Sequence, residues 1–507
     1  MQTKLALLES LDFGSSVAEE ETKNLQKYFV DTRLWRNLNN DKYDIVLGAK
    51  GSGKSALYLS LIAKTEDFAT QGIIIVEAEN PRGDTVFASL NTATRNDKYE
   101  NPSKEALIRD DIVVFWKLYF LTVITAKLRS QGFKGQHFRA IESLFESLGL
   151  LPEKLSLNEI FHKVIHFIGQ VVSLKFFKPK MVVDPATGSF EVTGEFSLDK
   201  YTAKEHKEGY NTLDELLEKL DIDLAAAQQT VWILLDRLDV AFADDKALER
   251  RALRALFMVY NSLKRYDQIR CKIFLRDDIM MNIIYDGLPE ASHLTPRMTN
   301  LVVDKHILFN ILIKRLLNNS SLVQHYKADA EACLLDIEKQ NQLFSAVFPA
   351  TLEENGEVLP TFGWIISRIS DGNELFTPRE LVQLLIQVKE HQIDLLQLGN
   401  KIPEGKLFTS NAFKKAIREV SKAKFVHTLL AENPGLMENL KKFRDAPPQV
   451  NTEWIRLTLK DNDGKELEDV DRFATRLSEL GFLKRVNETQ WRIPYLYQYA
   501  LGIAPEE

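Results

Sequence analysis

The chain has 507 residues, of which 45 % are hydrophobic and 27 % charged, and its formal net charge is −7. This composition predicts a globular protein of about two to four domains, and the negative charge argues against a protein that coats nucleic acid without sequence preference. With only Cys271 and Cys333, the chain has neither a disulfide framework nor a C-x-x-C metal site. Charged residues occur too early in the amino-terminal segment for a secretory signal, and no run of about 18 apolar residues exists to span a membrane. We therefore expect a cytoplasmic protein without a membrane span.

Residues 1–40 are expected to be a helical lead-in. A Ser-capped helix followed by a second short helical piece is predicted over residues 15–37. Two hydrophobic strands follow, at residues 43–47 and 72–78, and the second is rich in β-branched residues. Uninterrupted apolar strands of this kind are typical of a parallel sheet that is buried on both faces.

A phosphate loop separates the first strand from a helix predicted at residues 56–62. The loop matches the pattern G-x-x-x-x-G-K-[ST] with Gly48, Ala49, Lys50, Gly51, Ser52, Gly53, Lys54 and Ser55. Glycines let the backbone wrap a phosphate closely with its N–H groups pointing inward, and the helix places its positive end against the anion. The pattern predicts that Lys54 reaches the β- and γ-phosphates of a nucleotide and that the Ser55 hydroxyl ligates Mg²⁺.

Residues 85–228 are expected to form a mainly helical insertion. Apolar residues recur at helical spacing between Ile112 and Leu128, which predicts a helix with a strongly apolar face. Alternating apolar residues from Phe190 to Leu198, after a turn, predict a β-hairpin.

The next strand, residues 230–236, ends in a carboxylate. Ligands of open α/β sheets bind at the carboxyl ends of the strands, so Asp236 is the candidate Mg²⁺ anchor, and we expect its strand to lie beside the phosphate loop. Three residues further on, Asp239 is a candidate for orienting the attacking water. The alternative is that Asp239 caps the next helix or pairs with Arg237.

A helix at 245–265 and a strand at 269–275 complete a predicted parallel three-layer α/β core over residues 41–285. Arg276 follows that strand and is a candidate for contacting the γ-phosphate. An ion pair with Asp277 or Asp278 is the alternative.

Residues 286–400 are almost entirely amphipathic and predict a helical lid. Within it, Thr377, Pro378 and Glu380 form a helix-start signal, with Glu380 completing a capping box. Arg379 stands at the head of this helix and could contact the γ-phosphate, although a simple cap explains the pattern equally well.

Residues 401–507 predict a winged-helix domain, because a helix near 470–480 is followed by two short strands at 481–486 and 490–493. The alternative is a domain that merely packs on the lid. Residues 411–450 carry 8 Lys and Arg against 4 Asp and Glu, whereas residues 451–507 carry 8 against 11. Nucleic acid is therefore possible through residues 411–507, with the basic helix of residues 411–450 contacting phosphates, although a solvated face also explains that helix. A protein partner is preferred for the last domain.

Two histidines one helical turn apart, His162 and His166, lack the intervening glutamate of a zinc protease helix. We expect them to be core or surface residues. No motif for acyl transfer is present.

With these motifs in chain order, the sequence resembles the AAA+ and STAND-type P-loop ATPases over most of residues 15–507. It is similar to a prokaryotic family with a Tyr28-Phe29-Val30 lead-in and a C-terminal winged helix, several relatives of which are associated with anti-phage defence. The resemblance places Lys54 and Ser55 in Walker A, Asp236 in Walker B, Arg276 at sensor 1 and Arg379 at sensor 2. Many relatives have a glutamate where this chain has Arg237 or Val240, which implies slow or partner-dependent hydrolysis.

The resemblance implies an ATPase switch, with ATP and Mg²⁺ as ligands, that couples nucleotide state to homo-oligomer assembly or to an effector protein. An initiator-like ATPase that contacts DNA through the winged helix is the alternative. A small-molecule kinase is disfavoured, because no acceptor site is recognisable.

Overall fold

The computed structural model describes residues 4–22, 24–78, 102–174, 177–183, 190–196, 203–238, 246–288, 291–354, 356–459 and 469–503. The chain folds into two compact units. The sheet unit comprises residues 33–50 and 54–301, and the helical unit comprises residues 1–32, 51–53 and 302–507.

A five-stranded parallel sheet forms the centre of the sheet unit, with strand order β2-β5-β6-β1-β7. Its strands are β1 (Ile45–Gly48), β2 (Ile73–Glu77), β5 (Thr230–Leu235), β6 (Ile269–Arg276) and β7 (Met298–Asn300). The predicted strands are therefore confirmed. Parallel pairing requires crossover connections, and helices between the strands supply them.

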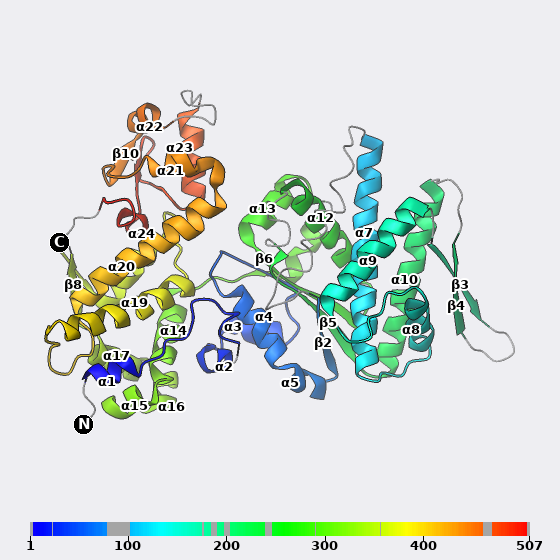
Figure 1. Ribbon diagram of the computed structural model, residues 1–507, viewed down its shortest axis with the longest axis horizontal. Coiled ribbons are helices and arrows are strands. Elements are labelled where there is room, and N and C mark those ends of the chain that lie inside the picture. Colours follow the sequence, from blue (N-terminus) through cyan, green and yellow to red (C-terminus); the bar gives the residue numbers. More distant parts are fainter. Residues whose placement is uncertain are drawn as a thin grey trace. The chain divides into compact units, whose positions relative to one another are not determined.

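Helices cover both faces of this sheet (Figure 1). Alternate side chains of the strands, such as Val231 and Ile233, join a core with α7 and α12. Those between them face α4 and α5, since Tyr58 of α4 contacts Phe274 and Phe68 of α5 contacts Trp232. The three-layer α/β arrangement follows from this alternation. The helices of the unit are α3 (Arg33–Asn39), α4 (Lys54–Ala63), α5 (Thr65–Thr70), α7 (Pro102–Ser130), α8 (Phe138–Ser147), α9 (Leu157–Leu174), α10 (Ala203–Ala226), α12 (Lys246–Leu263), α13 (Asp277–Tyr285), η2 (Ala291–His293) and η3 (Thr295–Arg297).

Between β2 and β5 the chain forms α7 to α10 and an antiparallel hairpin of β3 (Phe177–Val183) and β4 (Phe190–Phe196). Helix α7 is buried almost all round from Ile112 to Leu128, rather than on one face as the sequence predicts. Even Lys117 is only 4 % exposed and pairs with Asp214 at 2.7 Å. Neighbouring helices α8, α9 and α10 surround it, which a pattern within one helix does not reveal.

The helical unit is built around its own core. Its helices are α1 (Lys4–Glu9), α2 (Leu25–Tyr28), α14 (Lys305–Leu317), α15 (Ser320–Tyr326), α16 (Ala330–Leu335), α17 (Ile337–Val347), α18 (Thr361–Ile369), α19 (Pro378–Gln397), α20 (Ser410–Lys424), the π-helix η4 (Phe425–Leu430), η5 (Pro434–Leu436), α21 (Met437–Lys441), α22 (Thr452–Thr458), α23 (Val470–Glu479) and α24 (Tyr495–Gln498). A hairpin of β8 (Thr351–Glu354) and β9 (Glu357–Pro360) lies between α17 and α18.

Two segments differ from the sequence expectation. The Ser-capped helix predicted from residue 15 is a series of bends and turns, because the buried Glu21 carboxylate accepts the backbone N–H of Ser15 and pairs with Arg315. Residues 286–400 are not all helix, since β7 and the β8–β9 hairpin lie there. Strands of three or four residues are too short for a periodic pattern to reveal.

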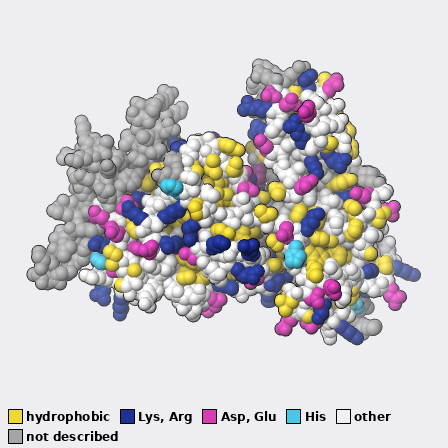
Figure 2. All heavy atoms as spheres, turned by 180° about the vertical axis from the view of Figure 1, so that it is seen from behind, with side chains coloured by type: hydrophobic (Ala, Val, Ile, Leu, Met, Phe, Trp, Pro, Cys, Tyr) yellow, Lys and Arg dark blue, Asp and Glu magenta, His cyan; other side chains and the backbone are white. Residues whose placement is uncertain are grey.

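The last hundred residues contain the elements expected there. Helix α23 is followed by β11 (Lys484–Arg485) and β12 (Gln490–Arg492), which pair antiparallel. A third strand, β10 (Gln449–Asn451), pairs with β12 and precedes α22. The surface of α21–α23, at the upper right of Figure 2, carries basic and acidic side chains interspersed.

Among the residues that the structure describes, no helix combines the length and the apolar composition that crossing a bilayer requires.

Candidate nucleotide-binding site

The phosphate loop joins the end of β1 to the start of α4. Gly51 and Gly53 have positive φ angles of 85° and 106°, a backbone region that only glycine adopts readily. A Cβ atom on Gly51 would lie 2.8 Å from the Thr377 hydroxyl oxygen and 3.1 Å from the Arg379 Cβ atom, within the helical unit. Both the conformation and the space therefore require glycine at position 51.

Polar groups of the loop fit a phosphate ligand. The Lys54 ammonium donates to the carbonyl oxygens of Gly48 and Ala49, at 2.8 and 2.9 Å, and so lies at the end of β1. The Ser52 hydroxyl is buried and has no hydrogen-bond partner among the described residues. Half-buried Ser55 lies in the first turn of α4, a ten-residue helix whose N-terminal end favours an anion.

Asp236 directly follows β5 and is 4 % exposed. The sequence predicts that this strand lies beside the phosphate loop, and the prediction is wrong. Strand β6 lies between β5 and β1. Neighbouring strands are about 4.8 Å apart, so β5 runs about 10 Å from β1. Strand order depends on which helices cross over the sheet, and a hydrophobic run carries no information about it.

Arg276 ends β6, the strand next to the phosphate-loop strand. Its Cα atom is paired in register with that of Gly48. The guanidinium Nε and Nη2 atoms donate to the two carboxylate oxygens of Asp278, at 3.0 and 2.8 Å. The ion pair that the sequence offers as the alternative is thus present, on a side chain that lies level with the phosphate loop.

Arg379 lies in the first turn of α19 and is half-buried. Its Nε atom is buried without a hydrogen-bond partner in the described parts of the chain. The predicted capping box does not form, since the Thr377 hydroxyl donates to one oxygen of Glu380 instead of accepting from the backbone. The other oxygen of Glu380 accepts from Lys424 at 2.8 Å, and this distant lysine competes with the local cap.

Asp239 lies outside the described residues, so its role stays a prediction. Arg237, two residues before it, has a positive φ of 58°, which is uncommon for an arginine. Glu77, which the sequence motifs do not single out, ends β2 at the same edge of the sheet and is paired in register with Leu234. Its position as the last residue of an apolar strand is the signal that could have revealed it.

The two histidines of α9, His162 and His166, are exposed. Within the described ranges, no group of three or more His, Cys, Asp or Glu side chains could hold a metal ion. Both histidines therefore lie at the surface, one of the two environments that the sequence predicts for them.

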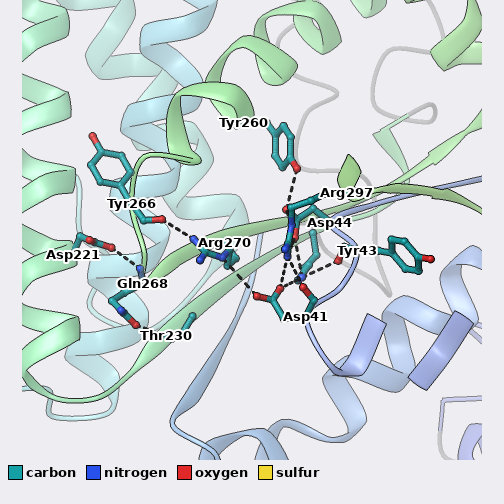
Figure 3. A network of polar contacts seen from close by, with 11 residues as sticks. Asp41, Tyr43, Asp44, Asp221, Thr230, Tyr260, Tyr266, Gln268, Arg270 and Arg297 are labelled. Carbon is teal, nitrogen blue, oxygen red and sulfur yellow. Dashed lines mark hydrogen bonds and ion pairs between the residues drawn. The ribbon is translucent and has the colours of Figure 1, made fainter. Parts of the chain in front are cut away.

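A network of buried charges, also missed by the sequence analysis, lies at the amino ends of β1 and β7 (Figure 3). Asp44 is 3 % exposed and accepts hydrogen bonds from Arg297 at 2.5 and 2.9 Å, from Lys272 at 2.9 Å and from Tyr260 at 2.9 Å. Asp41 also pairs with Arg297, at 2.7 Å, and with the fully buried Lys272. The network joins three neighbouring strands of the sheet and is structural.

The network shifts the protonation of its members. Burial raises the pKa of Asp44, but hydrogen bonds from Arg297 and the charge of Lys272 outweigh burial and hold this pKa below its usual value. Burial and the neighbouring Asp44 carboxylate raise the pKa of Tyr260, so its hydroxyl stays protonated and donates. Asp44 is therefore ionised at neutral pH.

No protein-family model matches this chain, and no curated protein is similar to it in sequence. The solved structure of the Aeropyrum pernix ORC2 protein, in ADPNP–ADP complexes, is 11 % identical to it. That comparison covers 92 % of this chain and 91 % of the other, with a TM-score of 0.28. A likeness with so low a TM-score carries no argument about this chain.

Proposed function

We propose that the protein binds ATP at the phosphate loop and hydrolyses it. The observation that carries this proposal is the complete G-x-x-x-x-G-K-S loop between β1 and α4, at the carboxyl edge of a parallel sheet, with Gly51 and Gly53 in positive-φ conformations. Inward-facing N–H groups, a lysine and a helix N-terminus together favour a triphosphate.

Ser55 and Asp236 are the residues that would hold Mg²⁺. The chemistry fits, because one hydroxyl and one buried carboxylate are oxygen ligands of the type that Mg²⁺ accepts. When bound, the ion neutralises charge on the β- and γ-phosphates.

In hydrolysis, a water oxygen bonds to the γ-phosphorus while the bond from that phosphorus to the β–γ bridging oxygen breaks. ADP, inorganic phosphate and a proton are released. Asp239 would orient the water, and Lys54 would stabilise the charge that develops on the phosphate oxygens. Arg276 and Arg379 are the further candidates for that stabilisation, one level with Gly48 and the other beside Gly51.

Asp239→Asn is expected to slow ATP hydrolysis by about 100-fold or more while changing the Kd for ATP by less than about threefold, since orienting water contributes to the transition state and not to binding. Single-turnover hydrolysis and equilibrium binding of ATP would measure the two effects. The matched control is Asp267→Asn, at a described position that follows α12 and precedes β6. Equal hydrolysis rates in Asp239→Asn and the parent would contradict a catalytic role and favour the alternative, in which Asp239 caps a helix or pairs with Arg237.

We further propose that the ATPase is a switch, with residues 286–400 as lid and residues 401–507 as a winged-helix domain. Support comes from the contact of Gly51 with Thr377 and Arg379, because the head of α19 then lies where the state of the loop could move it. Homo-oligomers or an effector protein would receive the signal. The connection to STAND proteins and anti-phage defence rests on the sequence resemblance alone.

The second candidate function is an initiator-like ATPase that contacts DNA. The order β10, α22, α23, β11, β12 favours it, since a helix pair with a small antiparallel sheet is the winged-helix arrangement. Titration of labelled duplex DNA at two salt concentrations, with and without ATP, distinguishes the candidates. Binding that falls steeply with salt and depends on ATP supports DNA, and no binding at low salt contradicts it.

A further inference from the structure

A cavity of about 620 Å³ lies in the helical unit, away from the phosphate loop in sequence. The end of α20, the π-helix η4, the end of α21 and residues 499–501 line it. A cavity of this volume suits a small organic ligand. None of these residues has a role in the ATPase proposed above.

The charge of the cavity favours an anion. Arg418, Lys422, Lys441 and Arg444 line it, against one carboxylate, that of Glu419. Lys441 pairs with Glu438 at 3.0 Å, whereas Lys422 and Arg444 are exposed and form no ion pair or side-chain hydrogen bond with any residue that the structure describes. Two cations from different elements thus converge on one space without an anionic partner.

The same cavity has an apolar side. Phe425, Val426 and Leu430 of η4 line it, and Val426 is 39 % exposed. π-Helices are rare and are frequently found at functional sites. A ligand that satisfies both sides has an anionic group on an aromatic or aliphatic body.

Charge also distinguishes a small ligand from a nucleic acid. The adjoining residues 451–507 carry 8 Lys and Arg against 11 Asp and Glu. That segment therefore supplies no excess of cations for an extended polyanion, whereas a single phosphate group needs only the few cations that line the cavity beside Glu419.

The cavity is connected to the head of α19 by one buried contact. Helix η4 begins directly after Lys424, whose ammonium donates to Glu380 at 2.8 Å. Glu380 is 3 % exposed, also accepts from the Thr377 hydroxyl and is adjacent to Arg379. A ligand that displaced η4 would therefore act on the residues that lie against Gly51.

We propose that this cavity binds a small phosphorylated molecule with an apolar or aromatic body, and that the bound molecule regulates the nucleotide site through Lys424 and Glu380. The regulatory half rests on the ATP binding proposed above. The binding half is independent of it.

Binding is tested with 1-naphthyl phosphate, by fluorescence titration of the full-length Lys54→Ala variant, in which the phosphate loop is impaired. Saturable binding is expected. The double variant Lys422→Ala/Arg444→Ala should weaken it at least about tenfold, since two charge-assisted contacts are lost. The matched control Lys415→Ala/Lys442→Ala removes two exposed charges from α20 and from the residue after α21, outside the cavity, and should stay within about twofold.

Two comparison ligands measure the contributions of the cationic side and the apolar side of the cavity separately. Inorganic phosphate and 1-naphthol should each bind at least about tenfold more weakly than 1-naphthyl phosphate, because each offers only one kind of contact. Equal affinity in both double variants, or equal affinity for inorganic phosphate, overturns the proposal. So does duplex DNA binding that depends on Lys422 and Arg444 while 1-naphthyl phosphate does not bind.

Regulation is tested in the chain with Lys54 intact. Saturating 1-naphthyl phosphate is expected to change the Kd for ATP by about fivefold or more. Lys424→Met should abolish this change while leaving 1-naphthyl phosphate bound. An unchanged Kd for ATP overturns the regulatory half, whereas a chain that binds the probe but never binds ATP contradicts the ATPase proposal instead.

Discussion

Replacing Lys54 with alanine is expected to weaken ATP binding at least about 100-fold and to abolish measurable hydrolysis. Two charge-assisted hydrogen bonds to phosphate oxygens, each contributing about 1.5–3 kcal/mol, would be lost, and tenfold in Kd corresponds to about 1.4 kcal/mol. Equilibrium titration with ATP and Mg²⁺, followed by a phosphate-release assay, measures both effects.

The fold should tolerate this change. The lysine is half-buried, and its two contacts are to the carbonyl oxygens of Gly48 and Ala49, so we expect a loss of unfolding free energy of only about 1 kcal/mol. Lys42→Ala is the charge-matched control, because Lys42 is exposed and precedes β1. Unchanged turnover in Lys54→Ala, with the control also active, would contradict an enzyme that works at the phosphate loop.

Asp44→Asn is expected to lower the unfolding free energy by about 3–5 kcal/mol at pH 7. Removing one member of a buried ion pair leaves its partner poorly compensated, since the fully buried Lys272 would keep only the partly exposed Asp41 as an anionic partner. Urea unfolding of the full chain measures the loss. Asp41→Asn is the control, since Asp41 is 35 % exposed and its replacement should change the unfolding free energy by about 1 kcal/mol or less.

The contribution of Asp44 to the unfolding free energy should decrease as the pH is lowered. Burial opposes ionisation of this carboxyl, yet Arg297 and Lys272 hold its folded pKa below the ordinary value of about 3.9. Its contribution is therefore fully present above about pH 4 and is lost as the pH falls through the folded pKa. The difference in unfolding free energy between parent and Asp44→Asn should narrow in acid, and a difference that widened there would contradict the assignment.

The phosphate loop is the part of the site that the sequence determines by itself. Gly51 and Gly53 must adopt positive φ, Lys54 must follow them, and these demands are local. The apolar strands and the β3–β4 hairpin are equally local patterns, which explains why they are found where the sequence predicts them.

The tertiary structure decided how distant residues meet. It placed β6 between β5 and β1, and it paired Glu380 with Lys424 rather than with a local cap. It also assembled the Asp44 network and the cavity beside η4. Each of these features brings together strands or side chains that are far apart in the sequence. Such partners meet only when the helices and strands that carry them pack together. Local pattern thus determined the loop that is proposed to bind a phosphate, and long-range packing decided which partner each distant side chain meets.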